Sequence, residues 1–255
     1  MRVKDIVEVI EGFAPYELQE PKDNTGLQVG SPEQEVHGVM IGFDCTADLV
    51  REAADAGCDM ILTHHPLLYH PLKSVDPADP TAGAVIEAVR CGVAVYSAHT
   101  SADKAEGGVS FAMARKLGLR NVRALIPGGF GAIGDLPCAL SAGDALRLVK
   151  DTFGIPVLRS SKPVSGLVTT IAMCGGSGSS LIEPARAAGA QLYICGDISY
   201  HYFFTPEGFM VADVGHFESE VAIVDVFYTL LRKNFPTFAV RVSADIVNSN
   251  PINYF

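Results

Sequence analysis

Apolar runs of strand length alternate along the first half of the chain with segments whose apolar residues recur every three or four positions. The runs predict buried strands, and the longer period predicts helices that bury one face. The expected helices span about 3–11, 47–56, 83–90 and 109–117, and the expected strands 38–43, 60–63 and 93–96. This alternation is typical of an α/β protein with parallel strands.

The alternation weakens between about 122 and 165, where the segment 127–131 breaks any regular element and only a helix at 142–153 stands out. It resumes with strands at 168–173, 191–194, 209–211 and 237–242 and helices at 181–188 and 219–231. We therefore expect a three-layer α/β protein with two lobes, residues 1–125 and 126–255. We also expect segments near the C-terminus to pack back on the first lobe.

The two expected lobes share a sequence repeat. Residues 52–65 align without gaps on 184–197, an offset of 132, and the same offset superimposes the preceding strands. Such a match predicts internal duplication. The alternative is chance similarity, because a helix that ends at glycine before a strand is common in α/β proteins. A match across several elements favours duplication.

Composition narrows the function classes. Hydrophobic residues make up 48% of the 255 positions, and no run of eighteen apolar residues occurs, so we expect a globular protein without a membrane partner. The net charge is −10 and the cations are scattered, which argues against nucleic acid as a partner. The first residues lack the apolar core of a signal peptide, and the six cysteines lie singly. We therefore expect a cytoplasmic protein with reduced thiols.

Histidines follow three of the expected strands. His64 and His65 come after the strand at 60–63, His99 after 93–96 and His216 after 209–211. Ligands of open α/β sheets bind beyond the carboxyl ends of the strands. The positions of these histidines therefore predict a site.

Two of these histidines have a carboxylate four residues later. Asp103 follows His99 and Glu220 follows His216, a spacing that places both groups on one helical face. Nitrogen and oxygen donors without thiolate suit Zn, Mn, Fe, Co or Ni better than a structural zinc site. The donors suffice for two divalent ions.

The adjacent histidines His64 and His65 can serve one centre only if the strand has ended, because successive side chains on a strand point to opposite faces. Pro66 favours that ending, since proline interrupts strand pairing. His37 and His70, in contrast, are interpreted as ordinary surface or core histidines.

Two other polar segments allow two interpretations each. The glycine-rich run 175–180 lies between a strand and a helix, where free amides can bind an anion, but a tight turn with a serine cap explains it equally well. Asp44 follows the strand at 38–43 and is either a hydrogen-bond partner of a metal ligand or a cap. The polar segment 23–26 is interpreted as a turn.

With these residues in view, the chain resembles the GTP cyclohydrolase 1 type 2 homologues, also called NGG-interacting-factor-three-like proteins. The resemblance extends over nearly the whole chain and no single motif would carry it. The motifs lie at 23–27, 63–66, 99–103 with 107–108, 175–178, 196–201 and 215–220.

The resemblance implies a dinuclear metal centre in a cleft between two similar lobes, and a toroidal homohexamer. Longer members of the family carry an inserted mid-chain domain, for which this length leaves no room. The ligands of the metal centre fall on His64, His65, Asp103, His216 and Glu220, and the last carboxylate is able to bridge both ions. The family usually has Asn-Leu at 101–102, Tyr at 217 and Thr at 195, where this chain has Ser-Ala, Phe and Cys. None of these differences removes a ligand, so they bear on the substrate.

The activity that the resemblance implies is metal-dependent hydrolysis, in which a metal-activated water opens the imidazole ring of GTP. His99 and His201 are the candidate catalytic residues, as proton shuttles, because histidine titrates near neutral pH. The run 175–180 would hold the phosphates. Two alternatives keep the metals: a phosphohydrolase acting on a nucleotide or other phosphate ester, and a non-catalytic metal-binding or adaptor ring protein.

Overall fold

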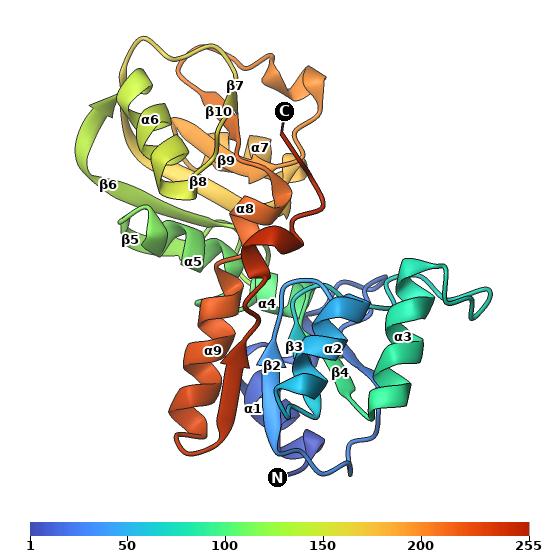
Figure 1. The fold of residues 1–255 in the computed structure, drawn as a ribbon. Helices are drawn as coiled ribbons and strands as arrows, with labels where there is room; N and C mark the ends of the chain where they lie inside the picture. Colours follow the sequence, from blue (N-terminus) through green and yellow to red (C-terminus); the bar gives the residue numbers. More distant parts are fainter. Residues whose placement is uncertain (255) are drawn as a thin grey trace. The chain divides into compact units, whose positions relative to one another are not determined.

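The computed structural model describes residues 1–254, with the backbone alone for 247 and 248. The chain forms two compact units, of which the first comprises 1–105 and 223–253 and the second 106–222 with Tyr254 (Figure 1). The sequence alternation places the division at 125. The contacts place it earlier because α5 (Val109–Lys116) packs on β5 (Arg120–Ala124) and β6 (Ala132–Ser141) of the second unit. The segments near the C-terminus, α9 (Ile223–Asn234) and β11 (Ala239–Val242), belong to the first unit.

The first unit is built on a five-stranded sheet in the order β1-β4-β3-β2-β11. Its other strands are β1 (Gly26–Val29), β2 (Gly38–Ile41), β3 (Met60–Thr63) and β4 (Ala94–Ser97). Strand β1 is antiparallel to β4, and the remaining pairs are parallel. Every residue of β2, β3 and β4 is buried, which is why these strands appear in the sequence as unbroken apolar runs.

Helices cover both faces of this sheet. Helices α2 (Ala47–Asp55) and α3 (Pro80–Cys91) pack on the face that carries Met40, Ile61 and Val95. Helix α1 (Val3–Phe13) packs against α9, which contacts β2 and β11. The starts of α2 and α3 have local causes: Thr46 caps α2 by accepting from the Leu49 amide, and Asp79 caps α3 by accepting from the Ala82 amide, with Pro80 at its first position.

The second unit has a six-stranded sheet in the order β5-β6-β8-β9-β10-β7. Its other strands are β7 (Arg159–Ser160), β8 (Leu167–Ser177), β9 (Leu192–Gly196) and β10 (Met210–Asp213). Strands β8, β9 and β10 are parallel and the other pairs antiparallel. Helices α5 and α6 (Ala142–Phe153) pack on one face, and α7 (Ile182–Ala187) on the other. Both units are therefore three-layered.

The two units share an order of elements. Each has three parallel strands, β2-β3-β4 or β8-β9-β10, and an antiparallel neighbour beside the third, β1 or β7. Each third strand leads into a five-residue helix, α4 (Thr100–Lys104) or α8 (His216–Glu220). This common order is consistent with the internal duplication that the offset of 132 predicts.

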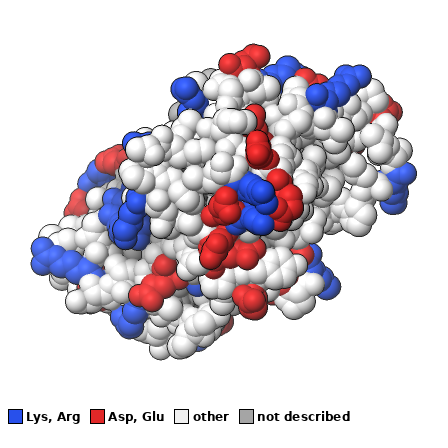
Figure 2. Space-filling view, turned by 90° about the horizontal axis from the view of Figure 1, so that it is seen from below, with Lys and Arg blue, Asp and Glu red and all other residues white. Residues whose placement is uncertain are grey.

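Two surface properties bear on function. None of the helices described within residues 1–254 is long and apolar enough to cross a membrane. On the face drawn in Figure 2, Lys and Arg side chains are scattered among Asp and Glu, and the residues shown there form no continuous basic surface. Binding to a nucleic-acid backbone relies on clustered cations, which this face does not offer.

Candidate metal-binding site

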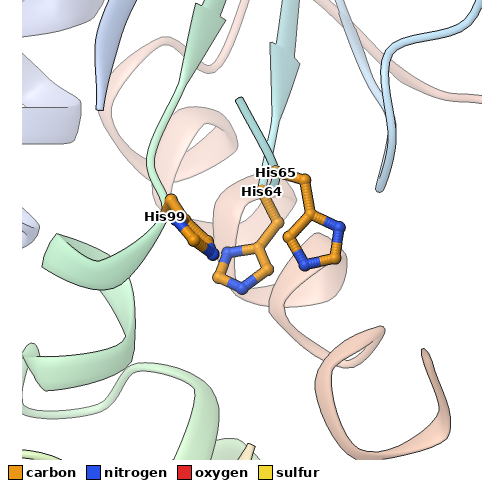
Figure 3. A group of neighbouring side chains, drawn as sticks. All are labelled: His64, His65 and His99. Carbon is orange, nitrogen blue, oxygen red and sulfur yellow. The ribbon is translucent and has the colours of Figure 1, made fainter. Parts of the chain in front are cut away.

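Three histidines of the first unit converge beyond the carboxyl ends of β3 and β4 (Figure 3). His64 and His65 follow β3 directly, and His99 immediately precedes α4. One ring nitrogen from each of the three lies within 4.8 Å of the other two. The ring of His99 has its centroid 5.4 Å from those of both His64 and His65. His99, a candidate proton shuttle from the sequence, is therefore also a potential ligand.

The adjacent pair reaches one site because the strand ends before it. Strand β3 stops at Thr63, and the amides of His64 and His65 both donate to the carbonyl of Phe43, each at 3.2 Å. Two successive amides that share one acceptor cannot belong to a regular ladder. The break that Pro66 indicates therefore occurs, and the two rings have centroids 5.0 Å apart.

Each of the three histidines has its Nδ1 atom hydrogen-bonded to an oxygen acceptor. Because carbonyl and carboxylate oxygens only accept, Nδ1 is the donor and Nε2 of the neutral ring carries the lone pair. Metal-binding histidines are commonly held in this manner. The pairs are His64 with the Ala98 carbonyl at 3.0 Å, His65 with Asp44 at 2.7 Å and His99 with Asp23 at 2.7 Å. Asp44 is thus the partner of a candidate ligand.

Asp23 belongs to the site although the polar pattern of the segment 23–26 indicates only a turn. Its carboxylate accepts hydrogen bonds from His99, from the amide and hydroxyl of Thr100 and from the Thr25 hydroxyl. Burial alone would raise the pKa of Asp23, but the bonds from His99 and Thr100 outweigh it and hold that pKa well below its usual range. An ionised Asp23 therefore fixes both His99 and the start of α4.

Helix α4 adds an oxygen donor to the first unit. The Asp103 amide donates to the carbonyl of His99 at 3.0 Å, which forms the helical turn expected from their spacing. The Asp103 carboxylate lies 3.5 Å from Nε2 of His64, and its side chain is 11% exposed. Imidazole nitrogens and a carboxylate oxygen therefore meet in one cluster.

A similar cluster forms in the second unit at α8. His216 and Glu220 are the first and last residues of this helix, and Nε2 of His216 lies 3.1 Å from the Glu220 carboxylate. Asp197, which follows β9, accepts from Nδ1 of His216 at 2.7 Å. Here too Nδ1 is held by a carboxylate and Nε2 faces the donor carboxylate. In both units the donor set is imidazole nitrogen and carboxylate oxygen, which fits Zn, Mn, Fe, Co or Ni.

The glycine-rich run 175–180 makes room for this second cluster. A Cβ on Gly176 would lie 2.3 Å from the Glu220 carboxylate and 3.1 Å from the His216 ring. The Gly176 amide already donates to the Ser219 hydroxyl at 2.9 Å. Beyond β8 the run enters a helix of only three residues, Ser179–Leu181. These contacts favour close packing of β8 and α8 over the expected phosphate-binding role.

Three other histidines differ from the cluster. His201 lies in the short helix Tyr200–Phe203, is exposed, and makes ring contacts with Tyr200 and Phe204. Its role as a proton shuttle stays a prediction. His37 pairs with Asp59 at 2.7 Å but is 77% exposed, and the His70 ring contacts Tyr69.

Comparison with known proteins gives a consistent family match. The model of the family DUF34/NIF3 (NGG1p interacting factor 3) matches residues 1–251. A Clostridium acetobutylicum protein named GTP cyclohydrolase 1 type 2 homolog is 34% identical over 229 residues, covering 86% of this chain and 85% of its own. A Clostridium perfringens protein of the same name is 31% identical over 228 residues, covering 86% and 87%.

The fold has close counterparts among solved structures. The Staphylococcus aureus hypothetical protein SA1388 superposes with a TM-score of 0.92, covering 100% of this chain and 99% of that one at 23% identity. At that identity the likeness concerns the fold.

Proposed function

Because the chain belongs to the DUF34/NIF3 family, we propose that it is a dinuclear metal-dependent hydrolase that opens the imidazole ring of GTP. The observation that carries the proposal is that four histidines, in two clusters with carboxylates, are all held at Nδ1 by oxygen acceptors. Such support orients the rings for metal and increases their basicity. The choice of GTP comes from the names of the relatives.

The proposed ligands of the two ions are His64, His65 and Asp103 of the first unit with His216 and Glu220 of the second. Nitrogen and oxygen donors in both units support this assignment, as does the family. If the units share their ions, His64→Ala and His216→Ala will each lower the content of both ions, measured by elemental analysis of protein reloaded with Mn or Zn. If each variant loses one ion and retains the other, the units bind metal independently.

Two divalent ions would lower the pKa of a water that they share and stabilise negative charge that develops during hydrolysis. The protein's part is to hold protons at defined atoms. Asp23 keeps the proton of His99 on Nδ1, so Nε2 is the atom that accepts or donates a proton if His99 acts as a shuttle. His201 is the second candidate shuttle, with an exposed ring. Asp103 and Glu220, whose carboxylates face Nε2 of His64 and His216, would help to position the ions.

Turnover of GTP by protein reloaded separately with Zn, Mn, Fe, Co and Ni tests the proposal. Ring opening is followed by absorbance and phosphate release in the same sample, with Glu220→Ala as the control. We expect ring opening that disappears in Glu220→Ala. Phosphate release alone would make the protein a phosphohydrolase, and silence with all five metals would refute hydrolysis of GTP.

His201→Ala and His99→Ala separate catalysis from metal binding. If a variant lacks a proton shuttle but keeps its metal, its turnover should be lower by about 10²- to 10⁴-fold, the usual contribution of general acid–base catalysis. If a variant keeps full turnover, its residue has no part in proton transfer. A variant that loses metal would instead identify a ligand, which the ring positions allow for His99.

A further inference from the structure

The first turn of α5, in the second unit, contains buried polar groups that lack partners among the described residues. Helix α5 begins at Val109, and its cap residue Gly108 has no side chain to offer. Ser110 is 1% exposed, and its hydroxyl has no hydrogen-bond partner. Within residues 1–254 the amides of Val109, Ser110 and Phe111 donate no backbone hydrogen bond. A buried hydroxyl of this kind is costly unless a ligand or water satisfies it, and the first amides of a helix likewise need partners outside the helix.

These groups together suit an anion. Amides at a helix N-terminus point outward at the positive end of the helix dipole, and they bind phosphate and carboxylate groups. Ser110 is the second residue of this turn, so its unsatisfied hydroxyl belongs to the same turn as the amides. The first turn of α5 contains no acidic residue that could occupy the place of a ligand. Arg115 adds positive charge, since its guanidinium donates to the Gly107 carbonyl at 3.1 Å.

The turn lies close to the proposed metal ligands of the same unit. A Cβ on Gly175 would lie 2.3 Å from the Val109 side chain and 3.0 Å from Cγ of Glu220. The first residue of α5 and the proposed ligand Glu220 therefore flank one glycine. Since the Glu220 carboxylate repels an anion, bound metal ions should strengthen anion binding at α5.

We infer that the first turn of α5, residues 107–111, binds a phosphate group of the substrate. The inference rests on the proposed function and deepens it, because it assigns phosphate recognition to α5 rather than to the run 175–180. Phosphate offers several acceptor oxygens for the amides, the Ser110 hydroxyl and the Arg115 guanidinium. The substrate class is accordingly a phosphorylated compound such as a nucleotide, with its phosphate near the ions and its base farther away.

Titration of the full chain with inorganic phosphate, by calorimetry with and without Mn, tests the inference. Ser110→Ala should weaken phosphate binding about tenfold, as expected for the loss of one hydrogen bond to a charged group. Ser110→Thr keeps the hydroxyl, so its affinity for phosphate should equal that of the unaltered chain. Ser180→Ala is the matched control, because this exposed serine belongs to the rival run 175–180. Arg115→Gln, at an exposed position, should weaken binding and its dependence on salt.

The outcomes distinguish this inference from the proposed function. Phosphate affinity that Ser110→Ala and Arg115→Gln leave unchanged would overturn it, as would a loss confined to Ser180→Ala. Binding that requires Mn and ignores all three variants would mean that the metal alone holds phosphate, and would also refute it. Because the titration needs no turnover, a protein that fails to hydrolyse GTP still gives the expected Ser110→Ala effect if the inference is correct. GTP should show the same loss, and guanosine none.

Discussion

At the scale of single residues, a hydrogen bond to Nδ1 does not by itself mark a metal ligand. His37 has the same pairing with an aspartate at 2.7 Å as His65, but its side chain is 77% exposed and it belongs to no cluster of donors among the described residues. The convergence of three rings, each with its Nδ1 held, distinguishes the candidate ligands. Loss of the carboxylate that holds His65 should therefore weaken metal binding, whereas loss of the carboxylate that holds His37 should not.

Asp44→Asn should lower the affinity for Zn by about 10- to 100-fold, because the carboxylate that orients His65 is replaced by an amide. Competition with a chromophoric chelator measures the change. Asp59→Asn is the control, since it alters the equivalent pair at His37. Equal losses in both variants, or none in Asp44→Asn, would contradict the role of Asp44.

The cysteines should react according to their burial. Cys91 and Cys138 are exposed, whereas Cys58, Cys174 and Cys195 are buried. Burial raises the pKa of Cys195 to about 12, so at pH 8 its thiol is protonated and unreactive. Ellman's reagent should modify two thiols quickly in the native protein and all six after unfolding. Fast reaction of Cys195 would show that the second unit opens locally.

At the scale of elements, the sequence predicts those whose burial is uniform. Strand β3 and helix α6 have the expected bounds, because one is wholly buried and the other carries a clear apolar stripe. Strand β6 was missed. Its ten residues include Gly134 and Pro137, six of them are exposed or partly exposed, and its register with β8 shifts between Asp135 and Leu140. Such a strand lacks a regular period of two.

The helix expected at 219–231 is in fact two helices, α8 and α9. They belong to different units, and the change of unit occurs between Ala222 and Ile223. The apolar period of α9 hid this break, because hydrophobic spacing reports burial and not the surface against which a residue packs.

Replacing glycine by alanine should have opposite effects on stability where a Cβ has space and where it meets neighbouring atoms. Gly12 lies in α1 with nothing within 4 Å of a Cβ, so Gly12→Ala should stabilise the fold by about 0.5 kcal/mol. At Gly178 a Cβ would lie 2.6 Å from the Tyr193 hydroxyl and 2.8 Å from Cβ of Cys174, and Gly178→Ala should cost about 1–3 kcal/mol. Urea unfolding measures both. Similar effects of the two variants would contradict the crowding at Gly178.

At the scale of the whole molecule, the sequence predicts the candidate metal ligands but not the carboxylates that hold their imidazole rings. Spacing and family resemblance give the histidines and carboxylates that follow strands. No spacing rule connects Asp23 with His99, 76 residues later, since that pair depends on tertiary packing. The same holds for Asp197 and His216. The toroidal hexamer remains a prediction from the resemblance, and light scattering on the purified protein tests it.

Removal of metal should destabilise the protein as a whole. A ligand that binds only the folded state stabilises it by about 2.7 kcal/mol at a free concentration of 100 Kd. Scanning calorimetry of chelator-treated protein should therefore show a lower midpoint that Mn or Zn restores. His64→Ala should remove most of that response, whereas His37→Ala should leave it intact. A midpoint that does not respond to metal would contradict binding by the folded chain.

Among the described strands of the first unit, β11 is the last to be synthesised. Strand β11 pairs with β2, and Glu52 accepts hydrogen bonds from the Ser243 hydroxyl and the Ala244 amide beyond it. The second unit, apart from Tyr254, is continuous in sequence and is synthesised before β11 exists. During translation the second unit can therefore fold while β2 still presents an unpaired edge. That edge is open to pairing with other chains until β11 has been made, so during synthesis the first unit needs more protection by chaperones than the second.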